Sequence, residues 1–196
     1  MRIVVFGDSI PAGFYDYERG GWVMRLRTAV MDPKKNIQVY DRSVSGDTTI
    51  DVLERVERDC KSIEPDIVIF QIGSNDAIYA PSKKKTWTST KEFRNNLSKL
   101  INVARKFTSK VIFTGLFLVD EKVANPWYDD EYYYNKYGQQ YDEIIQNVCK
   151  KENLRFIPMF DLVSVKLLED GVHPNAKGHQ KIFEVVRDYL KKEKLI

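Results

Sequence analysis

The sequence predicts an α/β protein, a three-layer α/β/α sandwich with five parallel strands at its centre. Short apolar runs rich in β-branched residues alternate with longer segments of helical period, and such alternation is typical of parallel strands joined by helical crossovers. The runs are apolar throughout, as expected for strands buried on both faces. The chain has 196 residues and no internal repeat or low-complexity linker, so a single domain over residues 1–196 is predicted.

Five segments are predicted as strands because each combines a continuous apolar run with β-branched or aromatic residues. In chain order they are Arg2–Phe6, Ile37–Val44, Asp66–Gly73, Lys110–Phe117 and Leu154–Met159. Five further segments are predicted as helices because their apolar residues recur every three to four positions. They are Trp22–Met31, Thr48–Ile63, Thr90–Phe107, Tyr132–Glu152 and Lys177–Lys192.

Helix boundaries are marked by local signals. The Asp32-Pro33 pair is expected to end the first helix, because a residue before proline avoids the helical conformation. A threonine cap begins the second helix, and Pro65 follows its end. Two connections, Ala77–Ser89 and Val119–Glu131, are longer than the architecture needs. Long loops in a compact domain are usually functional or mobile.

Charge and apolar content exclude several classes of protein. The net charge of +3 comes from interspersed residues, and the short basic run Ser82–Thr86 fits solvated surface, whereas a nucleic-acid footprint needs a clustered stripe. No segment approaches the roughly 20 apolar residues that span a bilayer. The apolar start of the chain is shorter than the roughly 7–15 residues of a signal-peptide core. A cytoplasmic protein, or one whose leader was removed, is therefore expected.

The two cysteines, Cys60 and Cys149, lie far apart in segments of helical period. They give no disulfide framework and no CxxC or zinc spacing. Buried or half-buried free thiols in a reducing compartment are expected. No metal and no organic cofactor is predicted.

The residues that follow the predicted strands are the first candidates for function, because ligands of open parallel sheets bind beyond the carboxyl ends of the strands. The first three strands are followed by GDS (7–9), SGDT (45–48) and GSND (73–76). The block DGVHP (170–174) comes after the last strand and a short connection. Glycines at such places let backbone N–H groups approach a ligand closely.

These residues match the needs of acyl transfer. Ser9 is a candidate nucleophile that needs a base to take its proton, and His173 is the plausible base at neutral pH. Asp170, three residues earlier, can orient the imidazole and stabilise its charged form. The backbone N–H groups of Ser9 and Gly46 and the side-chain amide of Asn75 can supply an oxyanion hole.

Taken in order, Ser9, Gly46, Asn75 and His173 resemble the four defining residues of the SGNH hydrolases, also called GDSL lipases/acylhydrolases. The blocks GDSI, SGDTT, GSND and DGVHPN match, as do GGWVMRLR and GHQKI, so the resemblance covers essentially the whole chain. It implies a flavodoxin-like sheet, the Ser9–His173–Asp170 triad, the three-part oxyanion hole and metal-free hydrolysis of carboxylic esters or thioesters. One departure is Ser43, where many relatives carry asparagine, and it concerns local loop bonding.

Two other readings remain open from the sequence. Asp8, Asp47 and Asp76 follow predicted strands and could hold Mg²⁺ in a phosphotransfer or receiver-like domain, although this leaves the DGVHP block unexplained. A non-catalytic carbohydrate-binding relative is the third reading. We expect Asp8 to bond backbone amides of its own turn, and His179 to cap or pack the last helix.

The substrate is a small-molecule ester that the sequence does not identify further. Aromatic residues gather in the two long loops and can pack on an acyl chain or a sugar, or simply cover the sheet edge. The substrate-binding candidates are Tyr79, Trp87, Trp127 and Tyr128. Short acyl esters, lysophospholipids, acyl thioesters and O-acetylated sugars all remain open.

Overall fold

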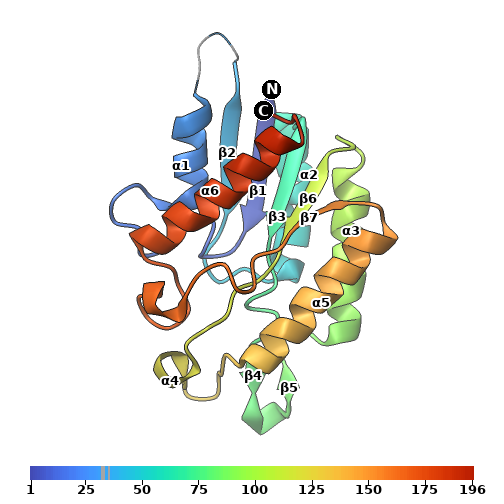
Figure 1. The fold of residues 1–196 in the computed structure, drawn as a ribbon. Coiled ribbons are helices and arrows are strands. Elements are labelled where there is room, and N and C mark those ends of the chain that lie inside the picture. Colours follow the sequence, from blue (N-terminus) through green and yellow to red (C-terminus); the bar gives the residue numbers. More distant parts are fainter. Residues whose placement is uncertain (32–33, 35) are drawn as a thin grey trace.

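The computed structural model describes residues 1–31, 34 and 36–196 and shows a five-stranded parallel sheet between two layers of helices (Figure 1). The strands follow the order β2-β1-β3-β6-β7, and every neighbouring pair is parallel. Their bounds are β1 Arg2–Gly7, β2 Gln38–Ser43, β3 Ile67–Gln71, β6 Val111–Thr114 and β7 Arg155–Ile157. The predicted sandwich is confirmed, with β7 shorter at both ends than the predicted Leu154–Met159.

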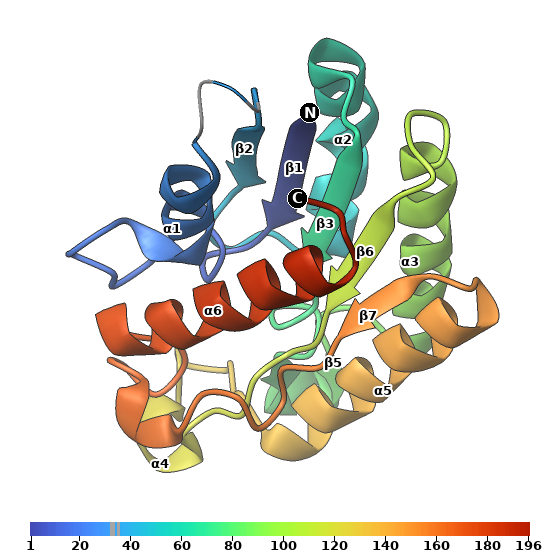
Figure 2. The same ribbon diagram turned by 45° about the horizontal axis from the view of Figure 1, so that its top comes forward.

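The helices cover the two faces of the sheet (Figure 2). On one face, α1 (Gly21–Val30) and α6 (Ala176–Lys192) pack against the odd-numbered side chains of β1. On the other, the even-numbered side chains Val4 and Phe6 meet a cluster from three helices. These are α2 (Thr49–Ile63), α3 (Thr90–Ala104) and α5 (Asn135–Lys151). Both faces of the sheet are therefore buried, which explains the continuous apolar runs of the strands.

Local signals set most helix ends. A reciprocal capping box of Thr48 and Asp51 begins α2, and one of Ser89 and Glu92 begins α3. The predicted helix start at Tyr132 is wrong, because Tyr132 pairs with Tyr79 in a β-bridge and the helix begins at residue 135. The predicted end of the third helix at Phe107 is also late, since α3 stops at Ala104. The Asp32-Pro33 pair lies outside the described residues.

The two long connections contain short elements that the sequence does not predict. Residues 77–89 form a small hairpin of β4 (Tyr79–Ala80) and β5 (Lys85–Thr86), joined by the 3₁₀ turn η1 (Pro81–Lys83). The one-turn helix α4 (Glu121–Ala124) lies in the other connection, and η2 (Val165–Leu167) precedes the DGVHP block. Figure 1 shows α4 and the hairpin at the end of the molecule toward which the strands point.

The two cysteines lie within helices, Cys60 in α2 and Cys149 in α5. Cys60 and Cys149 are buried free thiols, and burial raises the pKa of each to about 12. Such thiols stay protonated and unreactive at neutral pH. Among the described residues, no helix is both long and apolar enough to cross a bilayer.

Candidate active site

The carboxyl ends of three neighbouring strands bring Ser9, Gly46 and Asn75 together. Gly7 of β1 lies between its register partners, Ser43 of β2 and Gln71 of β3. The chain leaves each strand at this edge, so the turns that carry the three residues are adjacent. An amide hydrogen bond from Asn75 Nδ2 to the backbone oxygen of Asp47, at 2.9 Å, links the turns after β3 and β2 across the end of β1.

A hydrogen-bonded relay joins Ser9 to the DGVHP block. His173 Nε2 lies 2.8 Å from Ser9 Oγ, and His173 Nδ1 lies 2.7 Å from Asp170 Oδ2. Burial acts to raise the pKa of Asp170, but hydrogen bonds from the His173 side chain and nearby backbone outweigh it and lower that pKa. Because an ionised carboxylate only accepts, Nδ1 carries the imidazole proton. The lone pair of Nε2 therefore faces the Ser9 hydroxyl.

The turn that holds this relay is built around Asp170 and Gly171. The second carboxylate oxygen, Asp170 Oδ1, accepts the backbone N–H groups of Val172 at 3.0 Å and His173 at 2.8 Å. Gly171 has a φ of 85°, and a Cβ there would lie 2.7 Å from the backbone nitrogen of Ala124. The turn thus needs glycine both for its left-handed backbone and for the close approach of α4.

Three hydrogen-bond donors are free beside Ser9. Neither the Ser9 N–H nor the Gly46 N–H donates to any residue that the structure describes. Asn75 Nδ2 uses one hydrogen on Asp47, and its second has no acceptor in the described part of the chain. Gly46 has a φ of 87°, and apart from its two chain neighbours no described residue lies within 4 Å of a Cβ built on it. The three predicted oxyanion donors are thus not used by other described groups, and the turn at Gly46 has open space on its Cβ side.

Aromatic side chains surround the imidazole of His173. Ring centroids of Phe14, Tyr15 and Trp127 lie 5.1, 5.6 and 5.6 Å from it. Trp127 was a predicted substrate-binding candidate. Phe14 and Tyr15 were missed, although two aromatic residues so close in sequence to the proposed nucleophile are a usable signal.

A buried polar cluster anchors the loop that carries Phe14 and Tyr15. Asp16 accepts the Gly21 N–H at 2.9 Å and forms an ion pair with Arg25, whose Nε lies 2.9 Å away. His179 lies fully buried in α6, and its Nε2 donates to the backbone oxygen of Phe14 at 3.0 Å. Burial lowers the pKa of His179, which keeps it neutral. His179 thus supports the loop that carries Phe14 and Tyr15, and its bond is to that loop and not to Ser9.

The structure separates the other three substrate-binding candidates from His173. Trp87 and Tyr128, with 43% and 66% of their surfaces exposed, line a neighbouring hollow of about 270 Å³ between the hairpin and residues 128–131. Tyr128 still meets Trp127 edge to face at 5.9 Å. Tyr79 instead stacks on Tyr137 at 5.0 Å, within a cluster of tyrosines at the start of α5.

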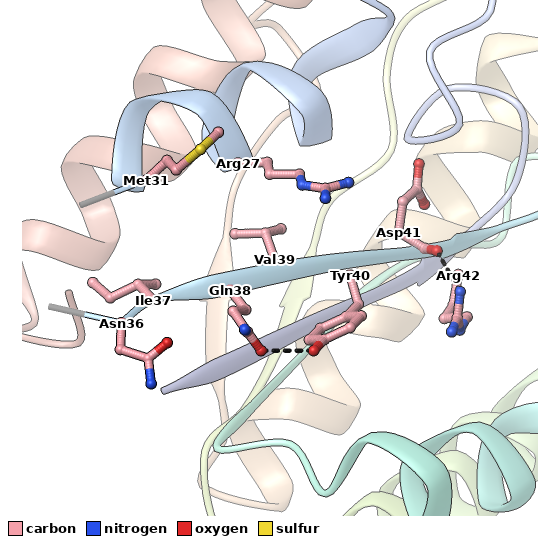
Figure 3. Close-up of a pocket in the computed structure, with 9 residues that line it drawn as sticks. All are labelled: Arg27, Met31, Asn36, Ile37, Gln38, Val39, Tyr40, Asp41 and Arg42. Carbon is pink, nitrogen blue, oxygen red and sulfur yellow. Dashed lines mark hydrogen bonds between the residues drawn. The ribbon is translucent and has the colours of Figure 1, made fainter. Parts of the chain in front are cut away.

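A larger hollow of about 480 Å³ lies away from these residues, between α1 and β2 (Figure 3). Its lining comprises Arg27, Met31 and residues 36–42, which lead into and form most of the edge strand β2. None of the predicted site residues lines it. Size alone therefore does not mark the functional cavity here.

The three aspartates that could suggest a magnesium site are separately engaged. Asp8 Oδ1 accepts the Ile10 N–H at 3.1 Å, which is the local turn bond expected for it. Asp47 pairs with Arg55, whose Nε lies 3.0 Å away, and Asp76 accepts both the backbone N–H and the hydroxyl of Thr49. The three carboxylates thus do not converge on a shared point, and the magnesium-dependent reading is not favoured.

Comparison with known proteins agrees with this geometry. Residues 5–181 match the model of the GDSL-like Lipase/Acylhydrolase family. An arylesterase of Vibrio mimicus is 25% identical over 97% of this chain and 88% of its own. An acetylxylan esterase of Geobacillus stearothermophilus is 24% identical over 91% of this chain and 88% of its own. A lipase/acylhydrolase structure from Enterococcus faecalis superposes with a TM-score of 0.80 at 24% identity, covering 98% of this chain and 96% of that one.

Proposed function

The chain belongs to the GDSL-like lipase/acylhydrolase family and hydrolyses ester bonds, and we propose that its reaction passes through an acyl-enzyme on Ser9. The observation that carries this proposal is the relay from Ser9 through His173 to Asp170. It supplies a nucleophile, a base oriented with Nδ1 toward Asp170 and Nε2 toward Ser9, and an anion that stabilises the charged imidazole.

Each step of the proposed reaction has a group in place. Ser9 Oγ attacks the ester carbonyl while its proton passes to His173 Nε2, and the resulting oxyanion accepts hydrogen bonds from the free donors of Ser9, Gly46 and Asn75. Collapse of this intermediate breaks the ester C–O bond, and His173 returns the proton to the departing alcohol. Water then attacks the acyl-enzyme, with His173 as base, and releases the acid and the Ser9 hydroxyl.

We propose a short acyl group, with acetyl as the first choice. An apolar hollow lined by neighbours of the site residues, Ile10, Ser74, Tyr133 and Val172 among them, has free space of only about 20 Å³. That is room for about one water molecule. The hollow between Trp87 and Tyr128 can take the alcohol part against two exposed rings. The likeness to an acetylxylan esterase supports a sugar as that alcohol, so that the substrate is an O-acetylated sugar.

A series of p-nitrophenyl esters tests both parts of the proposal. Acetate should be turned over faster than butyrate and octanoate, with and without EDTA, and Ser9→Ala should be inactive on all three. An organophosphonate should abolish activity and be found on Ser9 by mass spectrometry. Labelling of another serine, or full activity of Ser9→Ala, would contradict the nucleophile. A preference for octanoate would contradict the short acyl group and leave the nucleophile standing.

A further inference from the structure

The side-chain amide of Asn75 is held at both of its polar atoms. Nδ2 donates to the Asp47 backbone oxygen at 2.9 Å, and the Tyr133 hydroxyl lies 2.8 Å from Oδ1. A backbone carbonyl can only accept, so the nitrogen of the amide must face Asp47. The amide oxygen then faces Tyr133, whose hydroxyl must donate.

Tyr133 is itself fixed firmly. It is 7% exposed, and its backbone exchanges two hydrogen bonds of 2.7 Å with the side chain of Asn125. Its ring meets Trp127 nearly perpendicularly at 5.5 Å, and Trp127 in turn contacts His173. Burial raises the pKa of Tyr133 above its ordinary value, so the hydroxyl stays a donor throughout the neutral range.

We propose that Tyr133 is a positioning residue that sets the Asn75 amide for the oxyanion of the transition state. This rests on the proposed function, in which Asn75 is one of three donors to that oxyanion. Hydrogen bonds at two different atoms restrain rotation of the amide plane, and the second N–H of the amide has no acceptor among the described residues, so it stays available to the oxyanion. Donation to the amide oxygen also polarises the group and strengthens that N–H as a donor.

A purely structural role would have a different signature. In that case the Tyr133 hydroxyl only satisfies a buried amide oxygen, and its loss would lower stability without changing turnover by folded enzyme. A positioning role acts mostly in the transition state, so its loss would lower kcat with little effect on KM. The two roles are thus separated by kinetics measured per active site.

Tyr133→Phe is the test, because it removes one oxygen and keeps the ring. We expect kcat on p-nitrophenyl acetate to fall about tenfold, with KM changed less than twofold. The concentration of active enzyme is measured by titrating Ser9 with an organophosphonate, so that unfolded protein does not lower kcat. Tyr132→Phe is the matched control, since its ring stacks on Tyr134 and its hydroxyl bonds none of the described residues. It should keep wild-type kcat.

Tyr133→Phe is also made in an Asn75→Ala background, which gives a double-mutant cycle of the two residues. We expect Asn75→Ala to lower kcat by about 10²–10³, and Tyr133→Phe to add no further loss there. An equal tenfold loss in both backgrounds, or an unchanged kcat in the single variant, would overturn the positioning role while leaving Asn75 as a donor. A wild-type kcat in Asn75→Ala would instead overturn the proposed oxyanion role, and the Tyr133 proposal with it.

Discussion

The two oxygens of Asp170 have different tasks, and this determines what a substitution there will do. Oδ1 accepts two backbone N–H groups, while Oδ2 accepts from His173 Nδ1. In Asp170→Asn the amide oxygen must stay with the backbone donors, so the amide nitrogen faces the imidazole. Nδ1 must then accept and Nε2 must carry the proton, which is the wrong tautomer for a base.

We therefore expect Asp170→Asn to fold normally and to lose kcat by about 10³–10⁴. Steady-state kinetics and a thermal melt of the purified variant measure both properties. Asp170→Ala serves as a comparison, because it removes the turn acceptor as well and should also lower the melting temperature. Turnover near the wild-type rate in Asp170→Asn would remove Asp170 from the mechanism.

Asp8 makes the stability of the fold depend on pH. Burial raises the pKa of its carboxyl to about 7 in the folded protein, whereas an unfolded aspartate titrates near 3.9. The folded state therefore binds the proton more tightly. Tighter proton binding by folded Asp8 adds to the free energy of unfolding. This contribution is fully present below about pH 4 and is lost as the pH rises through about 7.

The comparison of wild type with Asp8→Asn isolates this effect. Between pH 5 and pH 8 the wild type should lose on the order of 2 kcal/mol of unfolding free energy relative to the variant. Urea unfolding curves at the two pH values provide the measurement. A difference that stays constant, or that grows in favour of the wild type with rising pH, would show that Asp8 is ionised throughout this range.

At the scale of elements, the segment 119–134 serves two parts of the site. Trp127 lies against His173, whereas Tyr128 turns to the hollow beside the hairpin. We expect Tyr128→Ala to keep p-nitrophenyl acetate turnover and to raise KM for acetylated sugars, because the larger alcohol loses its contact with the Tyr128 ring. Trp127→Ala should alter preference among acyl groups.

A chain-length series and a set of acetylated xylo-oligosaccharides measure these two selectivities. Val123→Ala, an exposed change on α4 in the same segment, is the control and should change neither. Identical profiles for wild type and Tyr128→Ala would remove the hollow from substrate binding. An unchanged acyl preference in Trp127→Ala would show that the Trp127 ring only packs against its neighbours and does not select the acyl group.

The regular elements follow from the sequence, and the short ones do not. Buried strands and amphipathic helices carry periodic signals over many residues, so ten of them are predicted with small errors at their ends. The β4–β5 hairpin has two residues in each strand, too few for any alternation to be visible. The true start of α5 depends on the long-range pairing of Tyr132 with Tyr79, which no local pattern reveals.

The same distinction applies to the site. Ser9, Gly46 and Asn75 are predictable together because parallel strands share a carboxyl edge. His173 and Asp170 are recognisable from their spacing. Tyr133 is not, because its contact with Asn75 depends on the path of an irregular loop held by Asn125.

At the scale of the whole molecule, the site is joined to the fold through the smallest of the apolar clusters that the described residues form. Ile78, Ala124, Tyr133 and Val172 form a small apolar group separate from the two large clusters on the faces of the sheet. Regions with few apolar contacts open at lower free energy than the core. The reactive pair itself, Ser9 and His173, is 164 residues apart in the chain, so its geometry depends on this region staying closed.

Activity should therefore be lost at a lower urea concentration than the core structure. Esterase rates measured in urea, with substrate at saturation, should decline before the far-UV circular dichroism does. Recovery of the rate on dilution distinguishes local opening from damage. Coincident transitions would show instead that the loop segment and the core unfold as one cooperative unit.

The shared anchoring of Trp127 and Tyr133 also bears on directed evolution of this enzyme. One stretch of chain holds both a wall of the pocket and the proposed support of the oxyanion donor, so randomising all of it would trade turnover for selectivity in most clones. A library that keeps Asn125, Trp127 and Tyr133 and varies residues 128–131 avoids this trade. Such variants would accept different alcohols, while the residues that stabilise the transition state keep their positions.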